Sequence, residues 1–184
     1  MNENETLFKQ TQELLEHNID KAKEKLLELR RKEETPEKNY LISKLLIEFG
    51  TKTGKVKYFN EAIGKLKKLT NSDFPRVHFY LGNAYLNKYR ILKPKYLNDN
   101  EKLLYNAKLE FKKEIDENPD ELLHGALINL GSIYDIIGRT IEALEIFNLV
   151  FEEFGTDYGL YNIQIFSLPK IVDMTIKKNK NMKD

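Results

Sequence analysis

The stretch LINLGSIYDIIGRTIEALEIF, Leu127–Phe147, decides the fold. Its apolar residues recur at the 3.6-residue spacing of a helix, yet two glycines interrupt it, and glycine inside a helix costs about 1 kcal/mol relative to alanine. Gly131 stands in the middle of a helix, where the absence of a side chain lets a neighbouring helix approach closely. Gly138 ends that helix in a left-handed cap, before Arg139 and Thr140 open the next. The stretch therefore predicts two helices joined by a tight turn.

Helical spacing continues along the chain, without a convincing run of alternating apolar and polar residues. Four segments each place an alanine four residues before a large apolar residue, and the alanines are 40, 45 and 36 residues apart. These pairs are Ala22 with Leu26, Ala62 with Leu66, Ala107 with Phe111, and Ala143 with Phe147. Another amphipathic segment precedes each pair, so the repeated unit is a helical hairpin. The first hairpin turns at EHNID, where Asn18 or Asp20 can cap the following helix.

This pattern resembles the tetratricopeptide repeat, a 34-residue hairpin with the signature W-x2-L-G-x2-Y, then A-x3-F, then P. Two hairpins match well and the two earlier ones match weakly. The matching residues are Leu127, Leu130, Gly131 and Tyr134 with Ala143 and Phe147, and His78, Leu81, Gly82 and Tyr85 with Ala107, Phe111 and Pro119. The resemblance implies an all-α fold, a right-handed superhelical array of helix-turn-helix hairpins with a C-terminal capping helix.

The length of 184 residues suits one such array. We expect a single domain over residues 1–184. Its hairpins are expected at about 5–34, 38–70, 75–118 and 122–155, its C-terminal cap at 156–178 and a frayed tail at 179–184.

Composition limits the cellular compartments and the kinds of site that the protein can have. The chain has no cysteine, which excludes a disulfide framework and a thiolate metal site. The start MNENETLFKQ lacks the basic and then apolar order of a signal peptide, and the apolar runs are too short to span a bilayer. We therefore expect a cytoplasmic protein that does not associate with membranes.

Charge is distributed unevenly along the chain. Residues 1–118 carry 24 Lys and Arg against 19 Asp and Glu, whereas residues 119–170 carry 2 against 8 and residues 171–184 carry 4 against 2. The positive excess of the first segment is spread thinly and lacks the clustered basic footprint of a nucleic-acid binder. A protein or peptide is therefore the favoured partner, and nucleic acid is disfavoured.

The resemblance also implies a binding site. In peptide-binding tetratricopeptide domains, the first helices of successive hairpins line a concave groove, where asparagines bind the peptide backbone and basic residues hold its terminal carboxylate. Asn83 and Asn129 match the asparagine positions, but Phe79 occupies the first basic position and the last falls near Gly159 and Ile163. We therefore expect a groove for peptide backbone without a strict carboxylate clamp. The predicted binding residues are Arg76, Phe79, Asn83, Leu86, Ile128 and Asn129.

The third hairpin is longer than the fourth. Gly82 and Ala107 are 25 residues apart, whereas Gly131 and Ala143 are 12 apart, so thirteen residues are added within NKYRILKPKYLNDNEKLLYN. Either the paired helices run longer, which we prefer, or the insertion carries a basic projection to an acidic protein surface or a phosphate backbone. The basic residues of that projection are Lys88, Arg90, Lys93 and Lys95.

No residue pattern indicates catalysis, and we expect no catalytic residue, metal site or cofactor. His17, His78 and His124 are too scattered for a local metal motif, and His78 is expected to be a buried structural residue. Several charged sets at helical spacing are expected to form solvated faces rather than acid/base or phosphate sites. These are Glu110 with Glu114, Glu142 with Glu145, and Lys65 with Lys67 and Lys68.

The sequence therefore favours a non-catalytic protein-interaction module that binds a peptide or partner protein. Two alternatives stay open. The array, the long third hairpin and the segment FGTDYGLYN faintly resemble the repeat half of prokaryotic defence proteins that carry a HEPN ribonuclease domain. A self-assembling scaffold, such as a homodimer formed by a repeat array with an incompletely capped end, is the second alternative.

Overall fold

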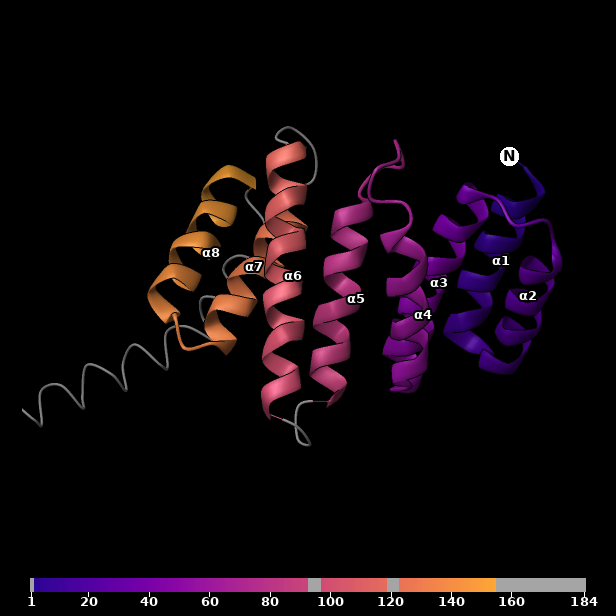
Figure 1. Ribbon diagram of the computed structural model, residues 1–184, viewed down its shortest axis with the longest axis horizontal. Helices are drawn as coiled ribbons and strands as arrows, with labels where there is room; N and C mark the ends of the chain where they lie inside the picture. Colours follow the sequence, from indigo (N-terminus) through magenta and orange to yellow (C-terminus); the bar gives the residue numbers. More distant parts are fainter. Residues whose placement is uncertain (1, 93–96, 119–122, 155–184) are drawn as a thin grey trace, which may run out of the picture. The chain divides into compact units, whose positions relative to one another are not determined.

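The computed structural model describes residues 2–92, 97–118 and 123–154, and these residues form α-helices with no strand among them (Figure 1). The prediction of an all-α fold is confirmed. The helices are α1 (Glu3–His17), α2 (Ile19–Arg31), α3 (Pro36–Thr53), α4 (Val56–Lys67), α5 (Val77–Leu92), α6 (Leu97–Glu117), α7 (Leu123–Ile136) and α8 (Thr140–Phe154). The expected cap at 156–178 and tail at 179–184 lie outside the described residues.

Two compact units divide the chain, residues 1–110 and residues 111–184, and each is described by itself. None of the helices within the described ranges combines the length and the apolar character that a membrane span requires.

The first unit is built from hairpins whose first helices are neighbours. Within it α1 packs against α2 and α3 against α4, while α3 also contacts both α1 and α5 (Figure 1). Large apolar side chains fill the space between the helices, because burying them removes apolar surface from water. The most deeply buried include Leu29, Ile42, Leu45, Leu46, Phe49, Phe59 and Leu66.

A constant stride of 36 residues relates the facing side chains of α1 and α3. Gln12 Nε2 donates to Glu48 Oε1 at 2.6 Å, and Lys52 Nζ donates to Glu16 Oε2 at 2.8 Å, with the partners 36 residues apart in both cases. The side chains of α1 and α3 therefore meet in one fixed register.

Helix boundaries follow from local capping chemistry. Asn2 and Glu5 form a capping box at the start of α1, and the Asn18 side chain accepts a hydrogen bond from the Lys21 backbone N–H at 3.1 Å to cap α2. Asp20, the other predicted cap, pairs instead with Lys23 at 2.7 Å. Of the two predicted caps, Asn18 is therefore the one that caps α2.

The second unit shows the two roles predicted for the glycines of the opening stretch. Gly138 has a φ of 82°, and the backbone N–H groups of Gly138 and Arg139 donate to the carbonyls of Asp135 and Tyr134 at 3.1 and 2.8 Å. This pattern is the Schellman motif, which ends α7. A Cβ atom on Gly131 would lie 2.6 Å from Cε1 of Phe147, so glycine is required for α7 and α8 to approach this closely. Both predictions are confirmed.

The third hairpin gains its length from its helices. α5 and α6 have 16 and 21 residues, whereas α7 and α8 have 14 and 15. This favours the preferred interpretation of the thirteen added residues, in which the paired helices run longer. Lys93 and Lys95 of the alternative basic projection lie outside the described residues, while Lys88 is half-buried and Arg90 is exposed.

Candidate functional site

Three of the predicted binding residues lie together at the start of α5, in the first unit. Arg76, Phe79 and Asn83 are all half-buried, and their spacing of three and then four residues places them along one face of the helix. The Arg76 guanidinium lies over the Phe79 ring, 4.0 Å from its centroid. A cation at this distance is attracted by the electron-rich face of the ring, so the two side chains form one continuous polar and aromatic surface.

Backbone strain accompanies this surface. Arg76 has a φ of 59°, a left-handed conformation that is uncommon for a residue other than glycine. Its carbonyl accepts the first hydrogen bond of α5, from the Tyr80 N–H at 3.1 Å, which holds this conformation in place. Strained residues of this kind concentrate at functional sites.

Leu86, a fourth predicted binding residue, has another role. Its side chain is only 1% exposed, so it packs in the core and presents no surface to a partner in this structure. We therefore leave it out of the candidate surface.

The last two predicted residues belong to the second unit. Ile128 and Asn129 are half-buried on α7. The six predicted binding residues thus divide between the two units, four in the first and two in the second.

A set of aromatic residues around a lysine was not predicted. The Lys44 ammonium on α3 lies 5.0 Å from the ring centroid of Phe8 on α1, 5.3 Å from that of Tyr40 and 5.0 Å from that of Tyr80 on α5. Phe74 stacks on Tyr40 with centroids 5.3 Å apart. We name Phe8, Tyr40, Lys44, Phe74 and Tyr80 the Lys44 cluster. It joins three helices of the first unit, and Phe79 extends it because its ring meets that of Tyr80 edge to face at 5.5 Å.

The charge of Lys44 is not matched by an ion pair. Within the part of the chain that the structure describes, no carboxylate oxygen lies within 4.0 Å of Lys44 Nζ. Glu48, one helical turn further along α3, is engaged by Gln12 instead. Burial raises the pKa of Glu48, although the Gln12 hydrogen bond and the charge of Lys44 act in the opposite direction. The cluster therefore holds a half-buried cation that has no ion-pair partner among the described residues. The rings of Phe8 and Tyr40 beside it are buried, whereas those of Phe74 and Tyr80 are half-buried.

His78 has the structural position expected of it, but its partner was not predicted. The ring is buried, and its Nδ1 lies 2.6 Å from Glu110 Oε2. The expectation that Glu110 and Glu114 form a solvated face is therefore wrong, since the Glu110 side chain is 14% exposed and Glu114 is 3% exposed. Carboxylates four residues apart indicate a shared helix face, but not whether that face meets water.

The three lysines expected on a solvated face of α4 divide into two kinds. Lys67 and Lys68 are exposed as expected. Lys65 turns toward α3, where its ammonium donates to Asn39 Oδ1 at 2.8 Å, and its side chain is only 22% exposed. The expectation is therefore wrong for Lys65.

The remaining predicted acidic pair, Glu142 with Glu145, lies on α8. Glu142 pairs with Arg139 at 2.7 Å, and Glu145 is exposed. Among the described residues, no three His, Asp or Glu side chains converge in a way that could hold a metal ion.

Comparisons of the chain with protein-family models, with curated proteins and with solved structures gave no match.

Proposed function

We propose that the chain is a non-catalytic protein-interaction module of the tetratricopeptide type, and that α1, α3 and α5 of its first unit bind an extended acidic peptide. The Lys44 cluster carries this proposal, because it places the half-buried rings of Phe74 and Tyr80 beside a cation that has no ion-pair partner in the described ranges. Aromatic side chains are enriched at protein interfaces, since they bury large areas and lose little conformational freedom.

An acidic side chain of the peptide would pair with Lys44. The three rings hold the ammonium in place before binding, so little side-chain entropy remains to be lost. Because Lys44 is half-buried, its attraction for a carboxylate is screened less by water and salt than that of a fully exposed lysine.

The face of α5 would contact the rest of the peptide. Arg76 supplies a second cation, the Phe79 ring supplies apolar surface, and the Asn83 amide carries both donors and an acceptor for peptide backbone groups. Peptides in an extended conformation are commonly bound through such backbone hydrogen bonds, with side-chain pockets adding specificity. Packed helices would offer this surface without first having to fold around the ligand.

Peptide binding is tested with a set of extended peptides that differ only in charge. Fluorescence anisotropy should give saturable binding for peptides with alternating acidic and apolar residues, and none for the corresponding basic peptides. Lys44→Gln should weaken binding about tenfold, as expected for the loss of one partly buried ion pair.

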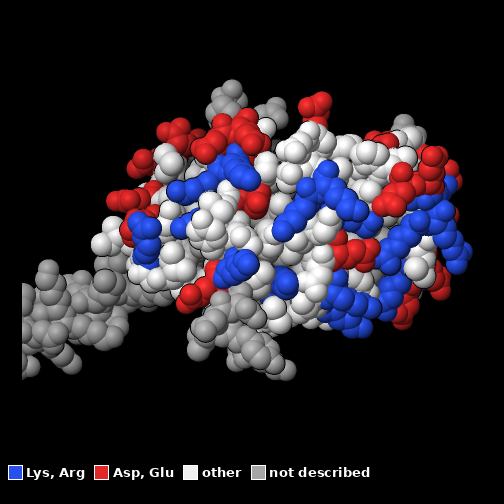
Figure 2. Space-filling view, in the orientation of Figure 1, with Lys and Arg blue, Asp and Glu red and all other residues white. Residues whose placement is uncertain are grey.

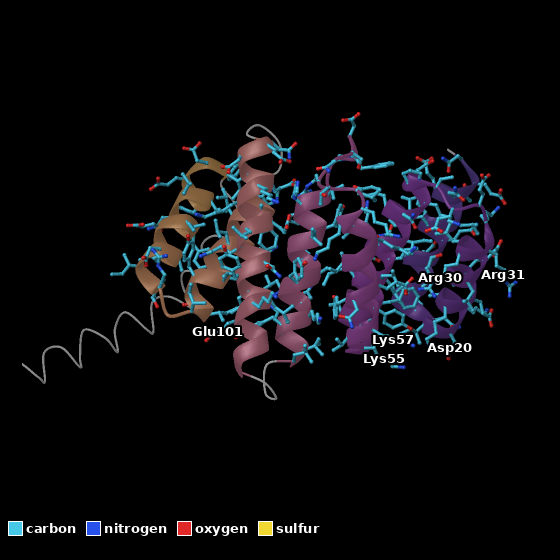
Figure 3. The ribbon with its side chains drawn as sticks, in the orientation of Figure 1. Asp20, Arg30, Arg31, Lys55, Lys57 and Glu101 are labelled. Atoms are coloured by element: carbon cyan, nitrogen blue, oxygen red, sulfur yellow. The ribbon has the colours of Figure 1, made fainter. Side chains whose placement is uncertain are left out.

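Lys55→Gln is the matched control, because Lys55 is an exposed lysine at the start of α4 and takes no part in the cluster (Figure 3). It should leave the affinity unchanged. Equal binding of acidic and basic peptides, or equal affinities of wild type and Lys44→Gln, would exclude this surface as the peptide site.

A further inference from the structure

A second feature of the first unit is a cavity of about 450 Å³ at the junction of two hairpins. The end of α2, the connection to α3, the start of α3 and one face of α4 form its walls. Figure 2 shows Lys and Arg side chains gathered over this part of the first unit, with acidic side chains among them. The residues that line the cavity are Arg30, Lys32, Glu34, Lys38, Asn39, Ile42, Glu61 and Lys65.

Lys38 is the most unusual member of this lining, because its side chain is buried with only 3% exposure. Lysine is almost never buried to this extent unless its charge is paired. Its ammonium donates to the backbone carbonyls of Arg30 and Lys32 at the end of α2. These carbonyls carry only partial negative charge, and no carboxylate of the described residues lies within 4.0 Å of Lys38 Nζ. The full positive charge of Lys38 is therefore only partly offset.

Arg30 contributes a donor that the described residues leave without a partner. Its Nη2 donates to both oxygens of Glu61, at 2.8 and 2.6 Å, which fixes the guanidinium against α4. Its Nε is buried and makes no hydrogen bond to any described residue. Since buried donors are nearly always bonded, an unsatisfied N–H group on a residue that lines the cavity is unusual. Figure 3 labels Arg30 and Arg31 near the end of α2.

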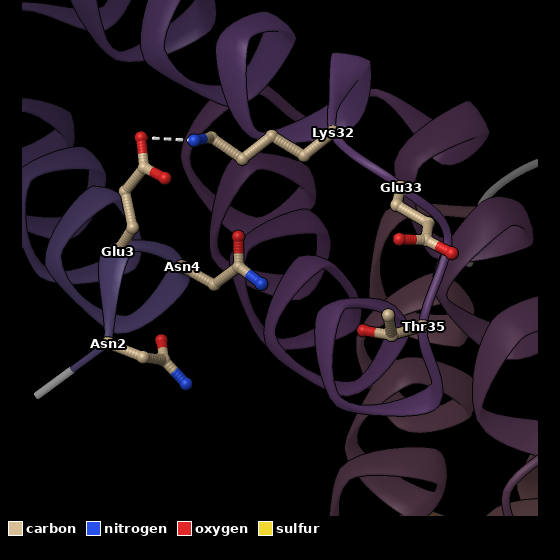
Figure 4. Close-up of a pocket in the computed structure, with 6 residues that line it drawn as sticks. All are labelled: Asn2, Glu3, Asn4, Lys32, Glu33 and Thr35. Carbon is tan, nitrogen blue, oxygen red and sulfur yellow. Dashed lines mark ion pairs between the residues drawn. The ribbon is translucent and has the colours of Figure 1, made fainter.

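The remaining charges do not cancel the positive ones. Lys32 pairs with Glu3 of α1 (Figure 4), and the other cations of the lining are Arg30, Lys38 and Lys65, beside the two carboxylates. Of these carboxylates, Glu61 is engaged by Arg30. Glu34 accepts a hydrogen bond from Asn39 at 3.2 Å and pairs with Lys65 at 3.8 Å. The lining thus keeps a positive excess, because Lys38 is the one of its four cations that has no carboxylate partner among the described residues.

We propose that this cavity, the Lys38 cavity, binds a phosphate group, either free or carried by a small molecule. A phosphate offers several acceptor oxygens and up to two negative charges, which suits a lysine ammonium and an arginine N–H group on neighbouring walls. The volume lies within the range of about 300–1,000 Å³ that is usual for small-molecule sites, and Ile42 adds apolar surface beside the charges. The site is separate from the peptide surface, because none of its residues belongs to the Lys44 cluster.

Binding is tested by NMR on the isotope-labelled full chain. Inorganic phosphate, AMP and the uncharged comparison adenosine are titrated at constant ionic strength, while the Arg30 Nε–Hε resonance and the backbone amides of residues 30–39 are followed. The two phosphate compounds should give saturable shifts and adenosine should give none. Tighter binding of AMP than of phosphate would assign the ligand as a phosphate ester, and equal affinities would assign free phosphate; either result supports the proposal.

Two variants and a control locate the site. Lys65→Gln removes one cation, and Arg30→Lys keeps the charge near Glu61 but removes the Nε donor, so each should weaken phosphate binding about tenfold. Lys68→Gln removes an exposed lysine from the end of the same helix and should have no effect. Absence of saturable shifts in the wild type, or affinities unchanged in both Lys65→Gln and Arg30→Lys, would overturn the proposal. Melting curves verify that each variant is folded.

Discussion

Two glycines within helices, Gly131 and Gly64, have opposite surroundings. A Cβ atom on Gly131 would meet the ring of Phe147 at 2.6 Å, whereas a Cβ atom on Gly64 would meet nothing within 4 Å. We predict that Gly131→Ala lowers the free energy of unfolding by about 1–3 kcal/mol, because the added methyl group overpacks the contact between α7 and α8. Gly64→Ala should raise it by about 0.5–1 kcal/mol, because alanine favours the helix and nothing opposes it.

Urea denaturation of the two variants measures this difference. The two substitutions are chemically identical, so the comparison isolates the effect of packing from that of helix propensity. Gly131→Ala at least as stable as the wild type would mean that Phe147 can move aside without cost.

Individual residues divide into those whose role is local and those whose partner is distant. The roles of Gly138 and Gly131 and the burial of His78 were predicted correctly, because turn chemistry and hairpin spacing act over short distances in the sequence. The role of Glu110 was predicted wrongly because its partner, His78, lies 32 residues earlier. The spacing of two carboxylates along one helix does not show whether their face meets water or another helix.

At the scale of elements, the turn between α7 and α8 depends on a left-handed residue. Gly138 has a φ of 82° in open surroundings, so a side chain there would be strained by the backbone and not by a neighbour. We predict that Gly138→Ala costs about 1 kcal/mol in the free energy of unfolding, and that Gly138→Asn costs less, because asparagine tolerates this conformation better.

Thermal denaturation of Gly138→Ala and Gly138→Asn tests this order. If alanine were tolerated as well as asparagine, the turn would have to adopt another conformation, which the loss of the Arg139 N–H bond to Tyr134 would reveal in hydrogen exchange.

Most of the elements could be predicted from the sequence, but the candidate surface could not. Helical periodicity and caps such as Asn18 define the hairpins through local interactions. The Lys44 cluster, in contrast, depends on the register between three helices, which places Phe8, Lys44 and Tyr80 side by side. The alanine spacings of 40, 45 and 36 residues differ too much to specify that register in advance.

For the whole molecule, the pH dependence of stability follows from its carboxylates. Most of the carboxyl groups whose pKa is shifted have a pKa below the ordinary value, chiefly because each accepts a hydrogen bond that favours its charged form. The donors are Lys52 for Glu16, Lys23 for Asp20, Lys25 for Glu28, Asn39 for Glu34 and a backbone N–H group for Glu142. The unfolded chain then binds more protons than the folded one in the acid range, so stability is lost as the pH falls through these groups. Glu48, whose pKa is raised by burial, acts in the opposite direction.

We therefore predict that the free energy of unfolding decreases as the pH falls below about 4.5, the ordinary pKa of a glutamate. Urea denaturation between pH 7 and pH 3 measures the slope. The carboxyl groups with a lowered pKa are exposed, so about 1 M salt should screen their attraction to the neighbouring cations and make the dependence of stability on pH less steep. A stability that stays constant or rises toward pH 3 would show that Glu48 outweighs the surface pairs.

The 36-residue stride between α1 and α3 also bears on how this surface could change over time. Phe8, Lys44 and Tyr80 are 36 residues apart and occupy equivalent positions of three successive hairpins, so each hairpin would contribute one residue to the proposed peptide surface. Substitutions at the half-buried positions Lys44 and Tyr80 would change this surface without removing a core side chain, whereas Phe8 is buried and also packs in the core. Duplication of a hairpin would add one more equivalent position in the same register. Substitutions at that position could then change the proposed specificity of the surface while the fold stays the same.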